Sequence, residues 1–233
     1  MLKINQLQCK VTDLQKAVSD FKELGFTVCW GADPERASNA FIYFENGPVI
    51  ELFLMPDIAY YAASVFGVFY GSSAKRRWKY WCRSNEGWCD FNLKSDNEEA
   101  SLENIGNIRN HVKNKNISVS RVIKGHRTQP DGQKLKFGYF VTDPVELPFI
   151  TSDYHIKNTI KKVKHKNGAK EIEWVKVGVN DKNRNKLELL TGDDKKIILV
   201  PSEHTNIIEI GIKGIKNKLD GNRLHGAKIV SLD

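Results

Sequence analysis

A single carboxylate interrupts an otherwise apolar run near the start of the chain. Glu51 lies between Val49-Ile50 and Leu52-Phe53, so a strand formed there would bury it. A buried carboxylate must be paired, protonated, bound to a metal or turned toward a wet cavity. Without a metal it could still act as a general base, because burial raises its pKa toward neutrality. Glu51 is therefore the first candidate catalytic residue.

An arginine and a histidine stand beside a turn later in the chain. Arg127 is followed by Pro130-Asp131-Gly132, and its forked guanidinium could anchor a carboxylate or phosphate group of a substrate. A surface arginine that stabilises the turn explains the pattern equally well, because Pro-Asp-Gly is itself a strong turn signal. His126 could act as an acid or base near neutral pH, but we expect it to be a loop residue without a chemical role.

A unit of one helix and four strands must position these residues. Alternating apolar side chains predict a strand over residues 2–11, and helical spacing predicts a helix between a Thr12–Gln15 capping box and Gly25. Three more strands are predicted at residues 26–30, 39–44 and 49–54. The order of elements is therefore β-α-β-β-β.

The same order returns later in the chain. Residues 58–81 are aromatic and helical in character, which predicts a two-helix connector, and a second unit follows over residues 87–153. Residues 156–170 are rich in basic side chains without periodicity, which predicts a solvated linker or an exposed hairpin. A third, partial unit is predicted at residues 171–233. Repetition of this kind is the main signal for the fold.

Several stretches carry a family resemblance. They are Val11 to Leu14, Phe21 to Phe26, Asn39 to Phe44, Ile50 to Leu52, Arg127 to Gly132, Leu147 to Ile150 and Asn167 to Ala169. Together they resemble the glyoxalase-like branch of the vicinal oxygen chelate superfamily. The resemblance implies an α+β fold in which paired βαβββ modules form a cupped mixed sheet around a small-molecule site. We place this domain at residues 1–155, in units 1–56 and 87–153, with the third partial module at the C-terminus.

The resemblance also implies a divalent metal, held by a His on the first strand and a Glu on the fourth strand of each unit. Glu51 stands at the Glu position, but Gln6 stands at the His position, and an amide oxygen binds a transition metal less strongly than imidazole. The second unit offers Cys89 or Asp90, and its fourth strand has no carboxylate. A reduced site of Gln6, Glu51 and Asp90 could hold a hard or borderline cation. The expected cofactor is none or a divalent metal ion, and absence of metal is favoured.

Other residues have competing interpretations. Gln6, Arg127 and Asn39 are the expected substrate-binding residues, whereas Asp90 could equally be a structural partner of Arg83. Glu209 is predicted to be the counterpart of Glu51 in the third unit. Because Trp174 takes the place of Gln6 there, that unit is predicted to be structural.

Composition argues against several classes of protein. The first residues lack a secretory signal, no stretch is apolar enough for a membrane span, and four cysteines without a CxxC pair indicate reduced thiols and a cytoplasmic protein. The net charge is +8, and basic residues alternate with aromatic ones between Lys75 and Trp81. Nucleic-acid binding is possible there, but we favour a solvated helix face with its aromatics turned to the core, because no nucleic-acid motif accompanies the run.

Two functions remain after these exclusions. The first is an enzyme of the lyase, isomerase or oxygenase kind acting on a small carbonyl or hydroxy compound, with Glu51 as base or ligand and Gln6 orienting an oxygen. The alternative is a noncatalytic protein that binds and sequesters a small molecule, with a degenerate metal site. An incomplete third unit would expose a sheet edge and an apolar face, which predicts a homodimer.

Overall fold

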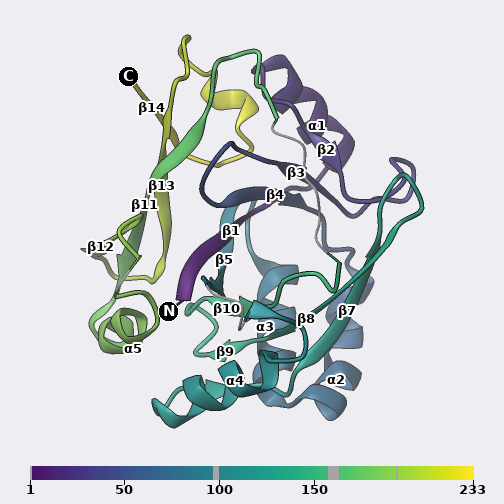
Figure 1. The fold of residues 1–233 in the computed structure, drawn as a ribbon, viewed down its shortest axis with the longest axis vertical. Coiled ribbons are helices and arrows are strands. Elements are labelled where there is room, and N and C mark those ends of the chain that lie inside the picture. The colour runs from purple at the N-terminus through teal and green to yellow at the C-terminus, as the bar shows by residue number, and fades with distance from the viewer. Residues whose placement is uncertain (1, 97–99, 157–162, 193) are drawn as a thin grey trace.

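The first two units form one curled sheet. In the computed structural model, which describes residues 2–96, 100–156, 163–192 and 194–233, the first unit consists of β1 (Leu2–Lys10), α1 (Leu14–Glu23), β2 (Cys29–Trp30), β3 (Asn39–Ile42) and β4 (Val49–Phe53). The second consists of β5 (Gly87–Ser95), α4 (Ile105–Asn114), β6 (Ser118–Val119), β7 (Ile123–Thr128), β8 (Lys134–Phe140), β9 (Thr142–Asp143) and β10 (Phe149–Thr151). Eight of these strands make a mixed half-barrel in the order β2-β3-β4-β1-β5-β10-β8-β7 (Figure 1).

Two helices connect the units, as the sequence predicts. They are α2 (Ile58–Tyr70) and α3 (Ser72–Arg83). Gly71 separates them with φ at 102°, a conformation that strains any residue with a side chain. Gly67, by contrast, lies inside α2. A small core of Ala74, Ile123, Val141 and Phe149 joins the helix pair to the sheet.

The C-terminal residues form a second, smaller sheet. It contains β11 (Glu171–Val179), β12 (Ile197–Pro201), β13 (Asn206–Lys213) and β14 (Ile229–Leu232), with α5 (Asp181–Thr191) between the first two strands. The strand order is β12-β11-β13-β14, and the sheet lies at the left of Figure 1. One continuous core joins it to the half-barrel, since Leu7 and Ile50 belong to the same buried cluster as Val175 and Ile210.

Strand alternation gives the half-barrel two different faces. Successive strand residues point to opposite sides of a sheet, so the fully buried Leu7, Ile50 and Leu93 share the convex face that packs into the main core. The residues beside them in sequence, such as Gln6 and Glu51, point to the concave face. The fold therefore places polar side chains inside a cup and apolar ones beneath it.

The start of α1 and the loop before β8 differ from expectation. The N-cap of α1 is Asp13, whose carboxylate accepts a hydrogen bond from the Lys16 amide, because the Thr12 hydroxyl donates to Glu86 instead. The strand β7 extends through Thr128, so His126 and Arg127 are strand residues and not loop residues.

The basic segment at residues 156–170 is only partly described, because residues 157–162 lie outside the described residues. At its described end, Lys164, Lys166 and Lys170 are exposed, whereas His165 and Asn167 are buried. His165 Nδ1 accepts a hydrogen bond from the Thr27 amide at 2.9 Å, and Asn167 Nδ2 donates to the Leu24 carbonyl at 2.9 Å. The buried side chains of His165 and Asn167 thus provide hydrogen-bond partners for the Thr27 amide and the Leu24 carbonyl, which follow the end of α1.

Glu209 is not the counterpart of Glu51. Strand β4 runs parallel to β1, which places Glu51 opposite Gln8. Strand β13 runs antiparallel to β11, which places Glu209 opposite Lys176, and the two side chains form an ion pair. The prediction failed because one carboxylate within an apolar strand does not reveal the direction of that strand.

A polar cluster joins α1, β5 and the C-terminal segment. Glu86 accepts hydrogen bonds from the backbone and the hydroxyl of Thr12, both at 2.8 Å, and His225 bridges Glu86 to Asp20. Burial raises the pKa of Glu86, but the hydrogen bonds from Thr12 and His225 outweigh it and leave the pKa below its usual value.

We expect the Glu86→Gln variant to be less stable than wild type near neutral pH. A carboxylate with a lowered pKa contributes stability above its unfolded pKa of about 4.3 and loses it as the pH falls through the lower folded value. The difference in unfolding free energy, measured by denaturant titration, should therefore shrink as the pH is lowered below about 4.3. A difference in unfolding free energy that stays constant at every pH would contradict this prediction. The Glu35→Gln variant, at an exposed position, is the control for replacing a Glu by a Gln.

Candidate functional site

The concave face of the half-barrel encloses a cavity of about 540 Å³. A polar wall comes from the first-unit strands and β5, and includes Gln6, Gln8, Asn39, Glu51 and Asn92. The facing wall comes from α3 and the second unit, and includes Trp81, Phe137, Tyr139, Phe149 and Tyr154. A cavity of this size, with one polar and one aromatic wall, suits a small organic molecule.

Glu51 is the centre of the polar wall. Its Oε2 accepts hydrogen bonds from Gln6 Nε2 at 2.5 Å and Gln8 Nε2 at 3.1 Å, and its Oε1 accepts from Asn39 Nδ2 at 2.7 Å. Gln6 is held in turn by Asn92, whose Nδ2 donates to Gln6 Oε1 at 2.8 Å. Three neutral amides from two strands, β1 and β3, therefore fix the carboxylate.

The environment of Glu51 alters its acidity. Burial raises the pKa of Glu51 above its usual value, although the hydrogen bonds from Asn39, Gln8 and Gln6 and the charge of Arg127 oppose this. Beside it, the Gln8 side-chain oxygen is buried without a hydrogen-bond partner among the described residues. Buried polar groups usually have a partner, so this oxygen is an acceptor available to a ligand.

Asp90 is drawn away from the other predicted ligands. Its Oδ2 accepts from Arg77 Nη1 at 2.6 Å and from Trp81 Nε1 at 2.7 Å. Arg77 is fully buried, and its Nη2 also donates to the Leu147 carbonyl at 2.5 Å. The partner of Asp90 is thus Arg77 and not Arg83, and Arg77 does not lie on a solvated helix face. The reason is that the face of α3 that carries Arg77 packs against β5.

Arg127 lies between two aromatic rings of the cavity wall. Its guanidinium carbon is 4.5 Å from the centre of the Phe41 ring and 5.2 Å from that of Tyr154. Its Nε is buried without a hydrogen-bond partner among the described residues. Stacking on aromatic rings holds the guanidinium flat in the wall of the cavity that Glu51 also lines.

The sequence prediction missed most of the cavity wall. The rings of Trp81 and Phe149 are 5.5 Å apart, and those of Phe149 and Tyr139 are 6.1 Å apart. Gln8 was missed as well. The spacing of these residues could have revealed them. Gln6 and Gln8 are two residues apart on β1, as are Phe137 and Tyr139 on β8, and residues with this spacing face the same side of a strand.

Comparison with known proteins identifies the family. A profile of a glyoxalase-like domain matches residues 7–191. The chain belongs to this glyoxalase-like domain family. The match to this glyoxalase-like domain begins in β1 and ends in α5, so it includes both units of the half-barrel. No curated protein sequence matches the chain.

Solved structures share the fold of this glyoxalase-like domain. A hypothetical protein from Staphylococcus aureus matches with a TM-score of 0.68 and 14% identity over 100% of both chains. The Mn(II)-bound glyoxalase from Novosphingobium aromaticivorans has a TM-score of 0.52 and 10% identity, over 94% of this chain and 67% of its own. Homoprotocatechuate 2,3-dioxygenase from Arthrobacter globiformis also has a TM-score of 0.52 and 10% identity, over 92% of this chain and 64% of its own. These similarities show that the chain shares the fold of these proteins.

The residues present do not fit the divalent metal that the superfamily resemblance implies. Within the described ranges, no three His, Cys, Asp or Glu side chains converge. The amides of Gln6, Gln8 and Asn39 already donate to the Glu51 carboxylate, and Asp90 is neutralised by Arg77. Divalent metals require oxygen, nitrogen or sulfur lone pairs, and N–H groups supply none.

We expect Arg77 and Asp90 to act as a unit in stability. Arg77→Met alone should lower the unfolding free energy by about 3–5 kcal/mol, because it leaves Asp90 buried without its partner. Adding Asp90→Asn should restore much of the loss, so denaturant unfolding of both single variants and the double variant should show strong coupling. Additive effects of the two changes would contradict the assignment.

Proposed function

We propose that this glyoxalase-like domain binds a small, flat organic molecule in its cup without a metal, and that Glu51 accepts a hydrogen bond from a hydroxyl or amine of that molecule. The observation that carries the proposal is the Glu51 carboxylate, which is buried and fixed by three amides in the cavity wall. A charged acceptor that is already oriented loses little entropy when a ligand binds. The carboxylate therefore favours ligands with a donor group.

The aromatic wall supports the same proposal. Trp81, Phe149 and Tyr139 form a connected series of rings on the side facing Glu51. Rings of this kind gain favourable contact with a planar ligand beyond the area they bury. A molecule with a flat apolar body and a polar edge would satisfy both walls at once.

The other predicted site residues take more specific roles in the proposal. Gln6 and Asn39 orient Glu51, and Arg127 is a secondary anchor for a ligand oxygen, since its Nε lacks a partner. Asp90 is structural, because Arg77 neutralises it. We place the protein in the cytoplasm, because its four cysteines are free thiols.

The test compares 2-naphthol with 2-methylnaphthalene, which has the same rings but no donor. In protein treated with a chelator, we expect 2-naphthol to quench tryptophan fluorescence saturably and to bind about 10- to 100-fold more tightly, because a hydrogen bond to a charged group contributes about 1.5–3 kcal/mol. Glu51→Gln should remove this preference, whereas Glu188→Gln on α5 should keep it. Equal binding of the two molecules to wild type would contradict the proposal.

The same titration has an expected pH dependence. Because burial raises the pKa of Glu51, the carboxylate gains its proton at a higher pH than an ordinary Glu does. The 2-naphthol preference should therefore weaken as the pH falls through that raised value and return as the pH rises. In Glu51→Gln the binding should not depend on pH in this range.

A second function is favoured by the raised pKa of Glu51 itself. A desolvated carboxylate is a competent general base for a C–H next to a carbonyl. Glu51 would take the proton and return it to the same or the neighbouring carbon, so that no oxidant is required. We expect wild type to exchange the methylene hydrogens of hydroxyacetone with D₂O, followed by proton NMR, and Glu51→Gln to lose the activity. Absence of exchange with wild type would exclude this activity for hydroxyacetone and leave binding as the function.

A further inference from the structure

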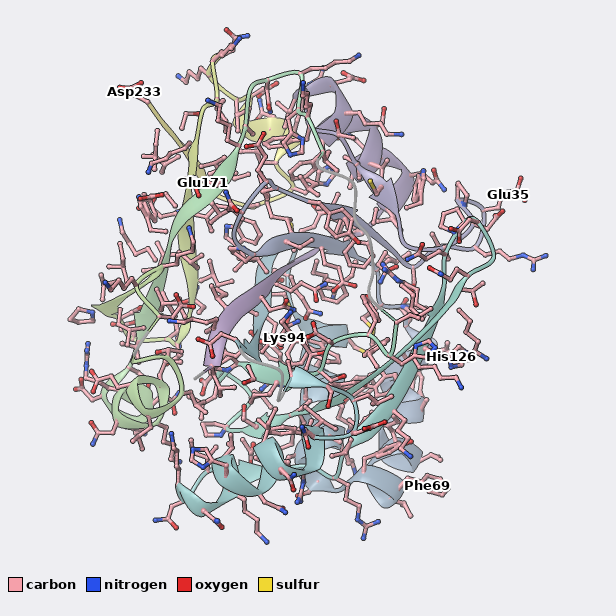
Figure 2. All side chains as sticks on the ribbon, in the orientation of Figure 1. Glu35, Phe69, Lys94, His126, Glu171 and Asp233 are labelled. Atoms are coloured by element: carbon pink, nitrogen blue, oxygen red, sulfur yellow. The ribbon has the colours of Figure 1, made fainter. Side chains whose placement is uncertain are left out.

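Helix α2 presents an apolar stripe that no described residue covers. Its exposed members are Ile58 (75%), Tyr61 (78%), Val65 (62%), Val68 (78%) and Phe69 (63%). Within the helix only Ala63 is buried. Figure 2 shows Phe69 pointing outward at the lower right, on the side away from the small sheet. None of the helices in the described residues is long and apolar enough to span a membrane.

The spacing of the stripe fits another helix. Ile58, Tyr61, Val65 and Val68 follow one another at intervals of three, four and three residues. This is the spacing of the a and d positions in a helix-to-helix seam, and Phe69 widens the seam beside Val68. The stripe therefore favours a protein helix as its occupant.

Charge favours a second copy of this helix over a membrane. No residue of α2 is charged, so two copies can meet without like-charge repulsion. Four of the five basic side chains of the neighbouring α3 already have partners: Arg76 pairs with Asp143, Arg77 pairs with Asp90, and Lys79 and Arg83 lie 4.8 and 4.4 Å from the centre of the Tyr60 ring. These contacts reduce the positive charge that α3 offers to anionic lipid headgroups beside the stripe.

The area of the stripe is close to what a dimer requires. Aromatic side chains alone present about 150–250 Å² each, so the two aromatic and three aliphatic members together expose on the order of 600 Å². A stable interface buries about 800 Å² per partner. The stripe and the polar residues at its margins can therefore supply an interface of standard size.

We propose that α2 is the contact surface of a homodimer, in which it packs against the α2 of a second copy across a two-fold axis. This interface differs from the small-sheet edge that the sequence suggested. It would also brace the cup, because Phe66 of α2 packs against Trp78 of α3 with ring centres 3.8 Å apart. The same α3 supplies Trp81 to the cavity wall.

The proposal is tested by sedimentation velocity of the full chain across a wide range of protein concentration. We expect wild type to sediment as a dimer and Val65→Glu to sediment as a monomer, because two like charges would be buried at the contact. Ile198→Glu, at an exposed position on the edge strand β12, is the matched control and should stay dimeric. A monomeric wild type, or a dimer lost only in Ile198→Glu, would overturn the proposal.

Cross-linking gives a readout that does not depend on dimer stability. Val65 lies near the middle of the stripe, so a two-fold axis there would bring its two copies together. Mild oxidation should convert Val65→Cys into a covalent dimer, while Glu188→Cys on α5 should stay uncoupled. Circular dichroism confirms that each variant is folded. If wild type stays monomeric and sediments with phosphatidylserine vesicles, the stripe is a lipid-binding surface and the dimer proposal is wrong.

Discussion

The site depends on the antiparallel pairing of β1 with β5, the two long strands at the centre of the half-barrel. Their register places Gln6 opposite Asn92 and Gln8 opposite Asp90. Strand β4 then adds Glu51 beside Gln8 from the other side of β1. Because strand residues alternate between faces, this one pairing sends all these polar groups into the cup and leaves the apolar residues between them for the core.

The small sheet repeats this central pairing without the site. Its β11–β13 pair is antiparallel like β1–β5, and both pairs are flanked by parallel strands. Trp174 occupies the place of Gln6, and a side-chain carbon on Gly211 would overlap the Trp174 ring, so the indole rests directly on the glycine backbone. Lys176 pairs with Glu209 beside it. Where the half-barrel has a polar cavity, the small sheet has a tryptophan and an ion pair.

The buried charges of the half-barrel are stabilised in two different ways. Asp90 is neutralised by the fully buried Arg77, which fixes α3 against the sheet. Among the described residues, the hydrogen bonds to the Glu51 carboxylate come from amides, which orient it without cancelling its charge, and Arg127 adds a positive charge nearby. A buried charge that is oriented but not neutralised can still interact strongly with a ligand. Under the proposed function, this difference separates the structural Asp90 from the ligand-binding Glu51.

The sequence by itself determined the order of elements, the family and the position of Glu51 on a buried strand. Hydrophobic periodicity and turn residues are local properties, so α1, β4 and the two helices of the connector could be predicted within a few residues. The partners of each charge could not be, because Arg77 meets Asp90, and Arg127 meets Phe41, only after separate elements are packed together. The direction of β13, which separates Glu209 from Glu51 in role, was also decided by tertiary structure. Strand direction and side-chain pairing depend on contacts between residues far apart in the chain, and such contacts leave no periodic signal in the sequence.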